Sequence, residues 1–385
     1  MDKIIIYSLL IFMIGCQSEE ESILSRIAEN LIQTKQLACS YSFQQVIPDM
    51  PDANWEAEGK VAFDFTQENA LHSNIYIERK GENGFKRLFV SDTLTDIKSE
   101  TSTLVKSAST DRNWLYGNLA LYFLPFELRE VLPSIANDST AKIVQAKDTI
   151  IYGIEATQVK FELEKSIVAG QLMEAKSTKN RYSLTVRKKD LLPIAWEVFL
   201  ENGGSIKTSF ANLSTSVSDS TWEILDQQSQ YLVLSGKEYN LRQQKTLDSQ
   251  VGQKMTDWRL PSIEGDTLTN HFFEKKLTLY EFFFVGCIGS VKAKPYIDSL
   301  KREFQEDLQV LNIETQGFSK KGVQSFAERF HLSTPILYDG KELANQLGVK
   351  GCPTFILVDE TGTIVHAGFG QVEKIKKLIE ERLRI

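Results

Sequence analysis

Two cysteines in the C-terminal part of the chain lie in sequence settings that can make a thiol reactive. The first, Cys287, follows the apolar run 282–285 and one glycine, and it opens the four-residue sequence CIGS. A strand that delivers a cysteine to the start of a helix places its sulfur beside unpaired N–H groups and the positive end of the helix dipole, and both favour the thiolate. We therefore predict that Cys287 is a nucleophile.

Ser290 completes that sequence, one helical turn after Cys287. A thiol at this position would attack a mixed disulfide on Cys287 and release the bound partner by exchange. The hydroxyl of Ser290 cannot carry out that step. Ser290 is included in the predicted catalytic site as the residue that stands where a resolving thiol would be.

The second cysteine, Cys352, precedes Pro353 and the apolar strand 355–358, which leads into the turn 359–362. Together with the CIGS sequence, these segments resemble the thioredoxin superfamily, and in particular the extracytoplasmic TlpA/ResA-type disulfide reductases and the related AhpC/TSA-type redoxins. In that family the proline before the fourth strand has a cis peptide bond, a conformation largely confined to X–Pro bonds, and lies against the active-site turn. The resemblance implies that Cys352 lies close to Cys287, which makes Cys352 the candidate resolving thiol.

The resemblance covers roughly the last third of the chain, residues 251–385, which is an ordinary size for one domain. It includes an opening segment, two further apolar strands and two helices, at 258–265, 277–285, 308–313, 323–330 and 372–383. This order of elements predicts an α/β thioredoxin fold.

The chain departs from the family pattern around the nucleophile. Gly286 stands where the family usually has tryptophan, and Ile288 with Gly289 replaces a proline-containing pair. The resemblance assigns partner binding to five positions: Gly286, Ile288, Gly289, Pro353 and Thr354.

Three functions stay open for this domain. The first is a thiol–disulfide oxidoreductase, or a monothiol exchange protein, that acts on exported proteins and depends on an upstream reductant. The second is a redox-inactive thioredoxin fold that binds partners, with Cys287 as a small buried hydrophobe. The third is a peroxiredoxin-like peroxidase, although that family has a threonine three residues before its reactive cysteine and this chain has Phe284 there.

The N-terminus resembles an export signal. Residues 4–15 form an apolar run that is too short for a membrane span and suits the central part of a signal peptide. Residues 12–16 resemble a bacterial lipobox, so we predict a signal peptide at 1–15, lipidation of Cys16 and an acidic tether at 16–22. The predicted location is the cell envelope, lipid-anchored at Cys16 and either periplasm-facing or on the outer-membrane surface.

The overall charge limits the classes of partner that the chain can bind. The chain has 44 Lys and Arg against 51 Asp and Glu, a net charge of −7. This balance argues against nucleic acid and against electrostatic attachment to anionic lipid, so the lipid anchor carries the predicted membrane contact. The expected partners are exported or envelope proteins with thiols or disulfides. The histidines lie at no metal-ligand spacing, and we predict neither a metal nor another cofactor.

Residues 23–240 have a different pattern. Apolar residues at helical spacing predict an amphipathic helix over 23–32, and alternating strands follow, for example at 61–65, 182–186 and 206–210. We predict a mainly antiparallel β domain with an opening helix, in which Cys39 is a spectator. The region weakly resembles the half-barrel domains of lipoprotein carriers, with 119–132 lining the concave face, but an ordinary packed core is the favoured interpretation. A polar stretch then predicts a linker at 241–250.

Overall fold

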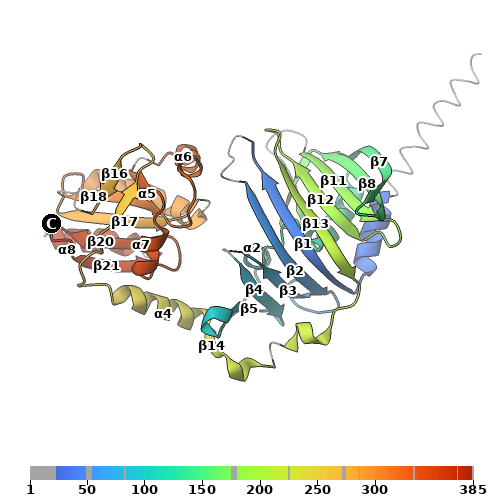
Figure 1. Ribbon diagram of the computed structural model, residues 1–385, viewed down its shortest axis with the longest axis horizontal. Coiled ribbons are helices and arrows are strands. Elements are labelled where there is room, and N and C mark those ends of the chain that lie inside the picture. Colours follow the sequence, from blue (N-terminus) through green and yellow to red (C-terminus); the bar gives the residue numbers. More distant parts are fainter. Residues whose placement is uncertain are drawn as a thin grey trace, which may run out of the picture. The chain divides into compact units, whose positions relative to one another are not determined.

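The computed structural model describes residues 23–48, 54–81, 84–174, 180–223, 226–270, 275–285, 287–332, 334–370 and 372–383. These residues form two compact units, the first extending to Gly236 and the second beginning at Lys237 (Figure 1). The predicted signal peptide, lipobox and tether lie outside the described residues. Within the described part, no helix combines the length and the apolar character needed to span a membrane.

The first unit is built on one sheet of twelve strands, in the order β14-β6-β5-β4-β3-β2-β1-β13-β12-β11-β8-β7. All neighbours are antiparallel except β14 and β6, which are parallel. The strands are β1 (Gln36–Val46), β2 (Trp55–Asp64), β3 (Asn74–Arg79), β4 (Phe85–Val90), β5 (Thr93–Lys98), β6 (Thr103–Ala108), β7 (Lys142–Ile151), β8 (Ile154–Leu163), β11 (Asn180–Arg187), β12 (Pro193–Phe199), β13 (Ser205–Ser214) and β14 (Leu232–Ser235). A separate hairpin pairs β9 (Lys165–Val168) with β10 (Gln171–Glu174).

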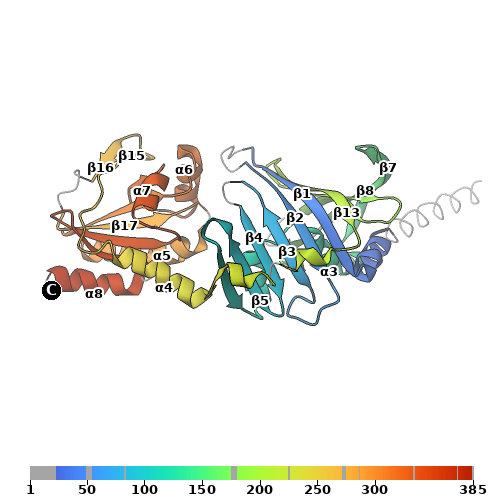
Figure 2. The same ribbon diagram turned by 60° about the horizontal axis from the view of Figure 1, so that its bottom comes forward.

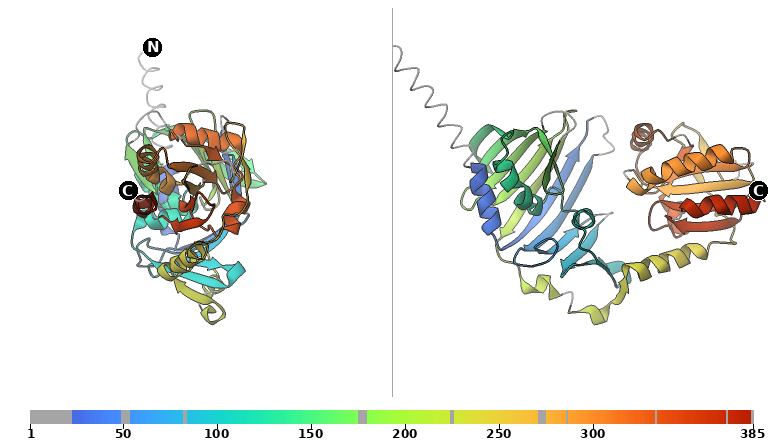
Figure 3. Two further views of the ribbon diagram at one scale, coloured as in Figure 1. Left: turned by 90° about the vertical axis from the view of Figure 1, so that its left-hand side faces the viewer. Right: turned by 180° about the vertical axis from the view of Figure 1, so that it is seen from behind.

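Three helices cover one face of this sheet, as the view from behind shows (Figure 3). They are the opening helix at residues 23–33, α2 (Arg112–Leu119) and α3 (Pro125–Ala136). Their apolar side chains share one core with the strands, so the predicted antiparallel domain with an opening helix is confirmed. Cys39 lies in that core, because alternate residues of β1 face inward.

The second unit has a five-stranded sheet in the order β19-β18-β17-β20-β21. Its strands are β17 (Leu277–Phe283), β18 (Leu308–Glu314), β19 (Ile336–Leu337), β20 (Thr354–Asp359) and β21 (Ile364–Phe369), and a small hairpin joins β15 (Arg259–Pro261) to β16 (Thr267–Thr269). The central strand β17 is parallel to β18 and antiparallel to β20. All seven of its residues are buried, because helices cover both faces of the sheet.

The helices of the second unit are α5 (Ile288–Glu303), α6 (Lys320–Arg329), α7 (Lys341–Gln346) and α8 (Val372–Leu383). Helices α5 and α8 pack on the face that carries Leu277 and Leu279, and α7 packs on the opposite face with Tyr280 and Phe282 (Figure 2). Helix α6 packs against Phe283. This arrangement is the thioredoxin fold that the order of elements predicts.

The segment in which we predict a linker, 241–250, lies mostly within a helix. Residues Gly236–Asp248 form α4, whose one buried side chain, Leu247, joins the core of the second unit. The side-chain amide of Gln244 also pairs with the outer edge of β21: it donates to the carbonyl of Ala367 at 2.9 Å and accepts the N–H of Phe369 at 3.3 Å. Because only Leu247 of its side chains is buried, the sequence of this helix is as polar as that of a linker.

Candidate functional site

Cys287 occupies the N-cap position of α5, at the point where β17 has delivered the chain to the end of the sheet. Its sulfur accepts the N–H of Ser290 at 3.5 Å, which is one of the unpaired donors of the first helical turn. The same thiol donates toward the carbonyl oxygen of Cys352 at 3.6 Å. The sequence-predicted setting of Cys287 at a helix start is therefore present in the structure.

The loop that carries Cys352 lies against this helix start. The bond between Cys352 and Pro353 is cis, as the resemblance implies. A Cβ atom on Gly289 would lie 2.8 Å from Cδ of Pro353, too close for any real side chain, so the absence of a side chain at Gly289 permits the contact. The structure thus brings the two predicted catalytic cysteines together, and both are free thiols.

Cys352 is half-buried, and its sulfur lies 3.7 Å from the hydroxyl of Thr315. Burial raises the pKa of the Cys352 thiol to about 12, the Thr315 hydroxyl lowers it, and Cys287, Glu281 and Glu314 raise it further through charge repulsion. Cys352 is consequently a protonated thiol at neutral pH.

A buried carboxyl group lies beneath the helix start. Glu281, on β17, is 5% exposed, and burial raises its pKa to about 8, while the nearby Ser290 hydroxyl lowers it and Asp298 raises it. Ser290 is 6% exposed. The two side chains are neighbours without a well-formed hydrogen bond, since Glu281 Oε1 and Ser290 Oγ have no partner among the described residues. Ser290 therefore puts a buried hydroxyl where a second active-site thiol would be. It lies beside Glu281, whose raised pKa keeps most of the carboxyl protonated at neutral pH.

A second buried glutamate fixes the loop beside Cys352. Glu314, the last residue of β18, is fully buried and accepts the backbone N–H groups of Gln316, Gly317 and Phe318 at 2.7, 2.9 and 3.1 Å. Burial raises its pKa, and the three backbone donors lower it. These bonds hold the turn that presents Thr315 to Cys352.

The remaining predicted partner-binding residues have different positions. Pro353 is buried against Gly289, and Thr354 is fully buried, its hydroxyl donating to the carbonyl of Gly351 at 2.7 Å. Thr354 thus holds the loop, and its side chain is not exposed. Gly286, the side chain of Ile288 and the predicted lipidation site Cys16 lie outside the described residues.

Sequence reasoning missed Glu281, Glu314 and Thr315. A signal for Glu281 existed: a single charged residue inside the otherwise apolar strand 277–283 is costly to bury and needs a reason to be there. Thr315 carries no such signal, because threonine is common at strand ends.

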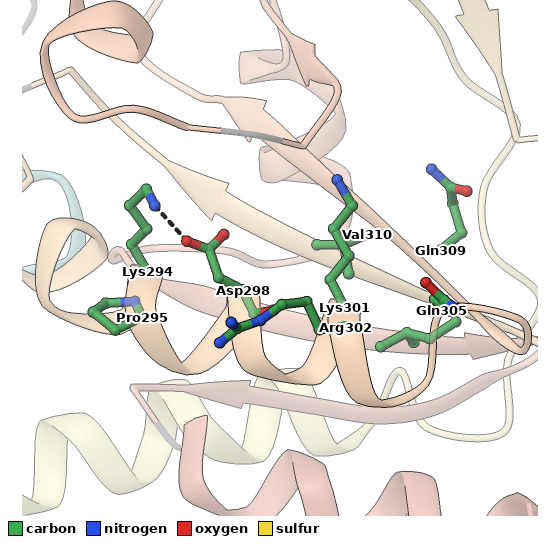
Figure 4. A pocket seen from close by; sticks show the side chains of 9 residues that line it. Lys294, Pro295, Asp298, Lys301, Arg302, Gln305, Gln309 and Val310 are labelled. Atoms are coloured by element: carbon green, nitrogen blue, oxygen red, sulfur yellow. Dashed lines mark hydrogen bonds and ion pairs between the residues drawn. The ribbon is translucent and has the colours of Figure 1, made fainter.

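A pocket in the second unit is separate from the two cysteines. It has a volume of about 630 Å³ and lies between the C-terminal half of α5 and the start of β18 (Figure 4). Lys294 and Asp298 form an ion pair on its wall, and Lys301 and Arg302 lie on the same helix. Among the described residues, no group of three or more His, Cys, Asp or Glu side chains could hold a metal ion.

Comparison with known proteins places this domain among the redoxins. Residues 250–381 match the family model described as Redoxin. The chain is 28% identical over 149 residues to the thioredoxin-like protein YneN of Bacillus subtilis, and the aligned region covers 38% of this chain and 85% of that protein. It is 29% identical over 134 residues to the thiol-disulfide oxidoreductase ResA of Geobacillus thermodenitrificans, covering 34% of this chain and 76% of the relative.

Solved structures with similar folds include the thioredoxin domain of a thiol-disulfide oxidoreductase from Bacteroides vulgatus, with 20% identity and a TM-score of 0.31 over 34% of this chain and 97% of that domain. A thiol-disulfide oxidoreductase from Bacteroides fragilis matches with 22% identity and a TM-score of 0.29 over 33% of this chain and 99% of the other. The family model and the sequence relatives together identify residues 250–381 as a redoxin-like domain, similar in sequence to thiol–disulfide oxidoreductases.

Proposed function

We propose that the second unit carries out thiol–disulfide exchange, with Cys287 as the attacking thiol and Cys352 as the resolving thiol. The observation that carries the proposal is the contact between the Cys287 sulfur and the carbonyl of Cys352 across the cis-proline loop, at 3.6 Å. Since each Cα atom lies within about 3 Å of the contacting atom of its own residue, the two Cα atoms are at most about 10 Å apart. A disulfide needs about 4.4–6.8 Å between Cα atoms, and both residues are free thiols here, so bond formation requires the two sulfurs to move into contact.

The exchange balances in two steps. The Cys287 thiolate attacks one sulfur of a partner disulfide, forming a mixed disulfide and releasing the other partner sulfur as a thiolate. The Cys352 thiolate, its proton passed to solvent, then attacks Cys287 Sγ and releases the remaining partner sulfur. The partner disulfide is reduced, the Cys287–Cys352 pair is oxidised, and a dithiol reductant restores it. Ser290 takes no part in electron transfer.

A second function, partner binding without redox chemistry, is favoured by one observation: Cys287 is only 5% exposed. The rate of reaction of this thiol separates the two functions. We expect Cys287 to form an adduct with a small aromatic disulfide faster than free cysteine does at pH 7, with the Cys287→Ser variant as the matched control. Reaction no faster than that of free cysteine would remove the physical basis of the exchange function and leave the binding function.

We further propose that the partners are exported or envelope proteins, and that Cys16 anchors the chain to a membrane through lipid. The support is the apolar run 4–15 and the lipobox-like sequence 12–16. Mass spectrometry of the chain purified from its native membrane fraction tests this: a mature N-terminus at Cys16 carrying acyl chains is expected, and an unprocessed or unmodified N-terminus would contradict it.

A further inference from the structure

The hydroxyl of Thr315 connects the backbone of the central strand to the sulfur of Cys352. It lies 3.0 Å from the carbonyl oxygen of Phe283 and 3.7 Å from Cys352 Sγ. A hydroxyl has one proton and can accept as well as donate, so it can serve both neighbours in only two ways. The protonation state of Cys352 decides between them.

When Cys352 is a thiol, its S–H points to the Thr315 oxygen and the Thr315 proton points to the Phe283 carbonyl. When Cys352 is a thiolate, the hydroxyl can turn and donate to the sulfur. The Phe283 carbonyl is not left unsatisfied by this rotation, because the backbone N–H of Thr315 also donates to it, at 3.0 Å. The hydrogen-bond switch therefore leaves no buried carbonyl without a donor.

The backbone of Thr315 is held on both sides. Glu314 accepts three N–H groups from the turn 316–318, and the carbonyl oxygen of Glu314 accepts the N–H of Gly340 at 2.9 Å. Gly340 has no side chain to interfere, since a Cβ there would lie 2.7 Å from that same oxygen. A β-branched residue fixed in this way has little freedom at χ1, so its hydroxyl stays beside Cys352.

We propose that Thr315 is a positioning residue for the resolving step, holding the Cys352 sulfur toward Cys287 and stabilising its thiolate by a hydrogen bond. The inference rests on the proposed exchange function. A hydrogen bond that stabilises the thiolate should lower the pKa of Cys352, and Thr315 does lower it. Burial and the neighbouring Glu281 and Glu314 raise the same pKa. Without this donor nothing described near the sulfur would offset burial, since Cys287, Glu281 and Glu314 all raise that pKa.

The test follows one turnover of the full chain with an aromatic disulfide. Formation of the Cys287 adduct and its release by Cys352 give separate rates. In Thr315→Val, which keeps the shape and removes the hydroxyl, we expect release to slow by about tenfold and its pH profile to move to higher pH, with adduct formation unchanged. Thr315→Ser restores the hydroxyl and should restore both the release rate and the profile.

The outcomes distinguish the two proposals. If wild type forms no adduct, the exchange function fails. If Cys352→Ala releases the adduct as fast as wild type does, Cys352 is not the resolving thiol, and the two-thiol exchange fails together with the role of Thr315. If wild type releases the adduct through Cys352 and Thr315→Val does so at the same rate at every pH, the role of Thr315 fails and the exchange function stands. If both Thr315 variants are equally slow with an unshifted pH profile, Thr315 has only a packing role and the proposal is again overturned.

Discussion

Gly289 and Pro353 touch with no room for a side chain between them: a Cβ on Gly289 would lie 2.8 Å from Cδ of Pro353 and 3.7 Å from both Cys287 Sγ and the Cys352 carbonyl oxygen. The contact places the first turn of α5 directly on the cis-proline loop. One glycine therefore sets the distance between the two thiols of the proposed site.

Gly289→Ala should push the loop away from the helix. We expect a loss of about 1–3 kcal/mol in the free energy of unfolding, because the clash is with a rigid proline ring, and slower release of a Cys287 adduct. Urea unfolding and the adduct assay measure the two effects. The control is Gly117→Ala in α2, where a Cβ meets nothing within 4 Å; it should be neutral or slightly stabilising. Unchanged stability and release in Gly289→Ala would contradict the tight contact.

Glu281 should make the protein less stable as the pH rises. Its pKa is raised from 4.5 to about 8 in the folded state, so between these values the folded chain keeps a proton that the unfolded chain has lost. Folding is then favoured at low pH, and this contribution is lost as the pH rises to about 8, by roughly 1.4 kcal/mol for each pKa unit. Glu281→Gln removes the titrating group. Between pH 5 and 9, the free energy of unfolding from denaturant titrations should change less with pH for Glu281→Gln than for wild type. Parallel pH profiles for the two proteins would refute a raised pKa for Glu281.

Ser290→Cys should create a dithiol site. The new thiol would replace a buried hydroxyl of similar size, one helical turn from Cys287 and beside the carboxyl of Glu281. We expect turnover in a coupled insulin-reduction assay to rise above that of wild type, and Cys287→Ser to abolish it. No gain in Ser290→Cys would mean that access to Cys287, which is 5% exposed, limits the chemistry instead.

Cys352→Ala should prolong the life of a mixed disulfide on Cys287. The intramolecular attack that releases the partner is gone, whereas the rate of adduct formation depends on Cys287 and should stay within about twofold. Quenched samples analysed by mass spectrometry give both rates. Cys39→Ala is the matched control: Cys39 is buried in the first unit, burial raises its pKa to about 12, and its removal should change neither rate. Equal release from Cys352→Ala and wild type would leave Cys287 acting as a monothiol.

The parts of the fold that the sequence predicts are those that apolar pattern and backbone chemistry determine locally. The stretch 277–285 is apolar enough to identify the central strand, which ends at Phe283, and the closing helix is predicted at 372–383, where α8 begins and ends. The cis bond at Pro353 follows from family resemblance. Thr315 could not be predicted, because its contact with Cys352 depends on how two loops meet, 37 residues apart in the chain. Helix α4 looked like a linker because only Leu247 of its side chains is buried.

The pairing of Gln244 with β21 makes α4 part of the fold of the second unit. The redoxin match begins at residue 250, after α4 has ended, yet the outer edge of β21 uses the amide of Gln244 in place of another strand. An open strand edge is a template for pairing with other chains. A fragment that begins at residue 250 would leave this edge open, so we expect it to aggregate more readily than a fragment that begins at Lys237 and keeps α4.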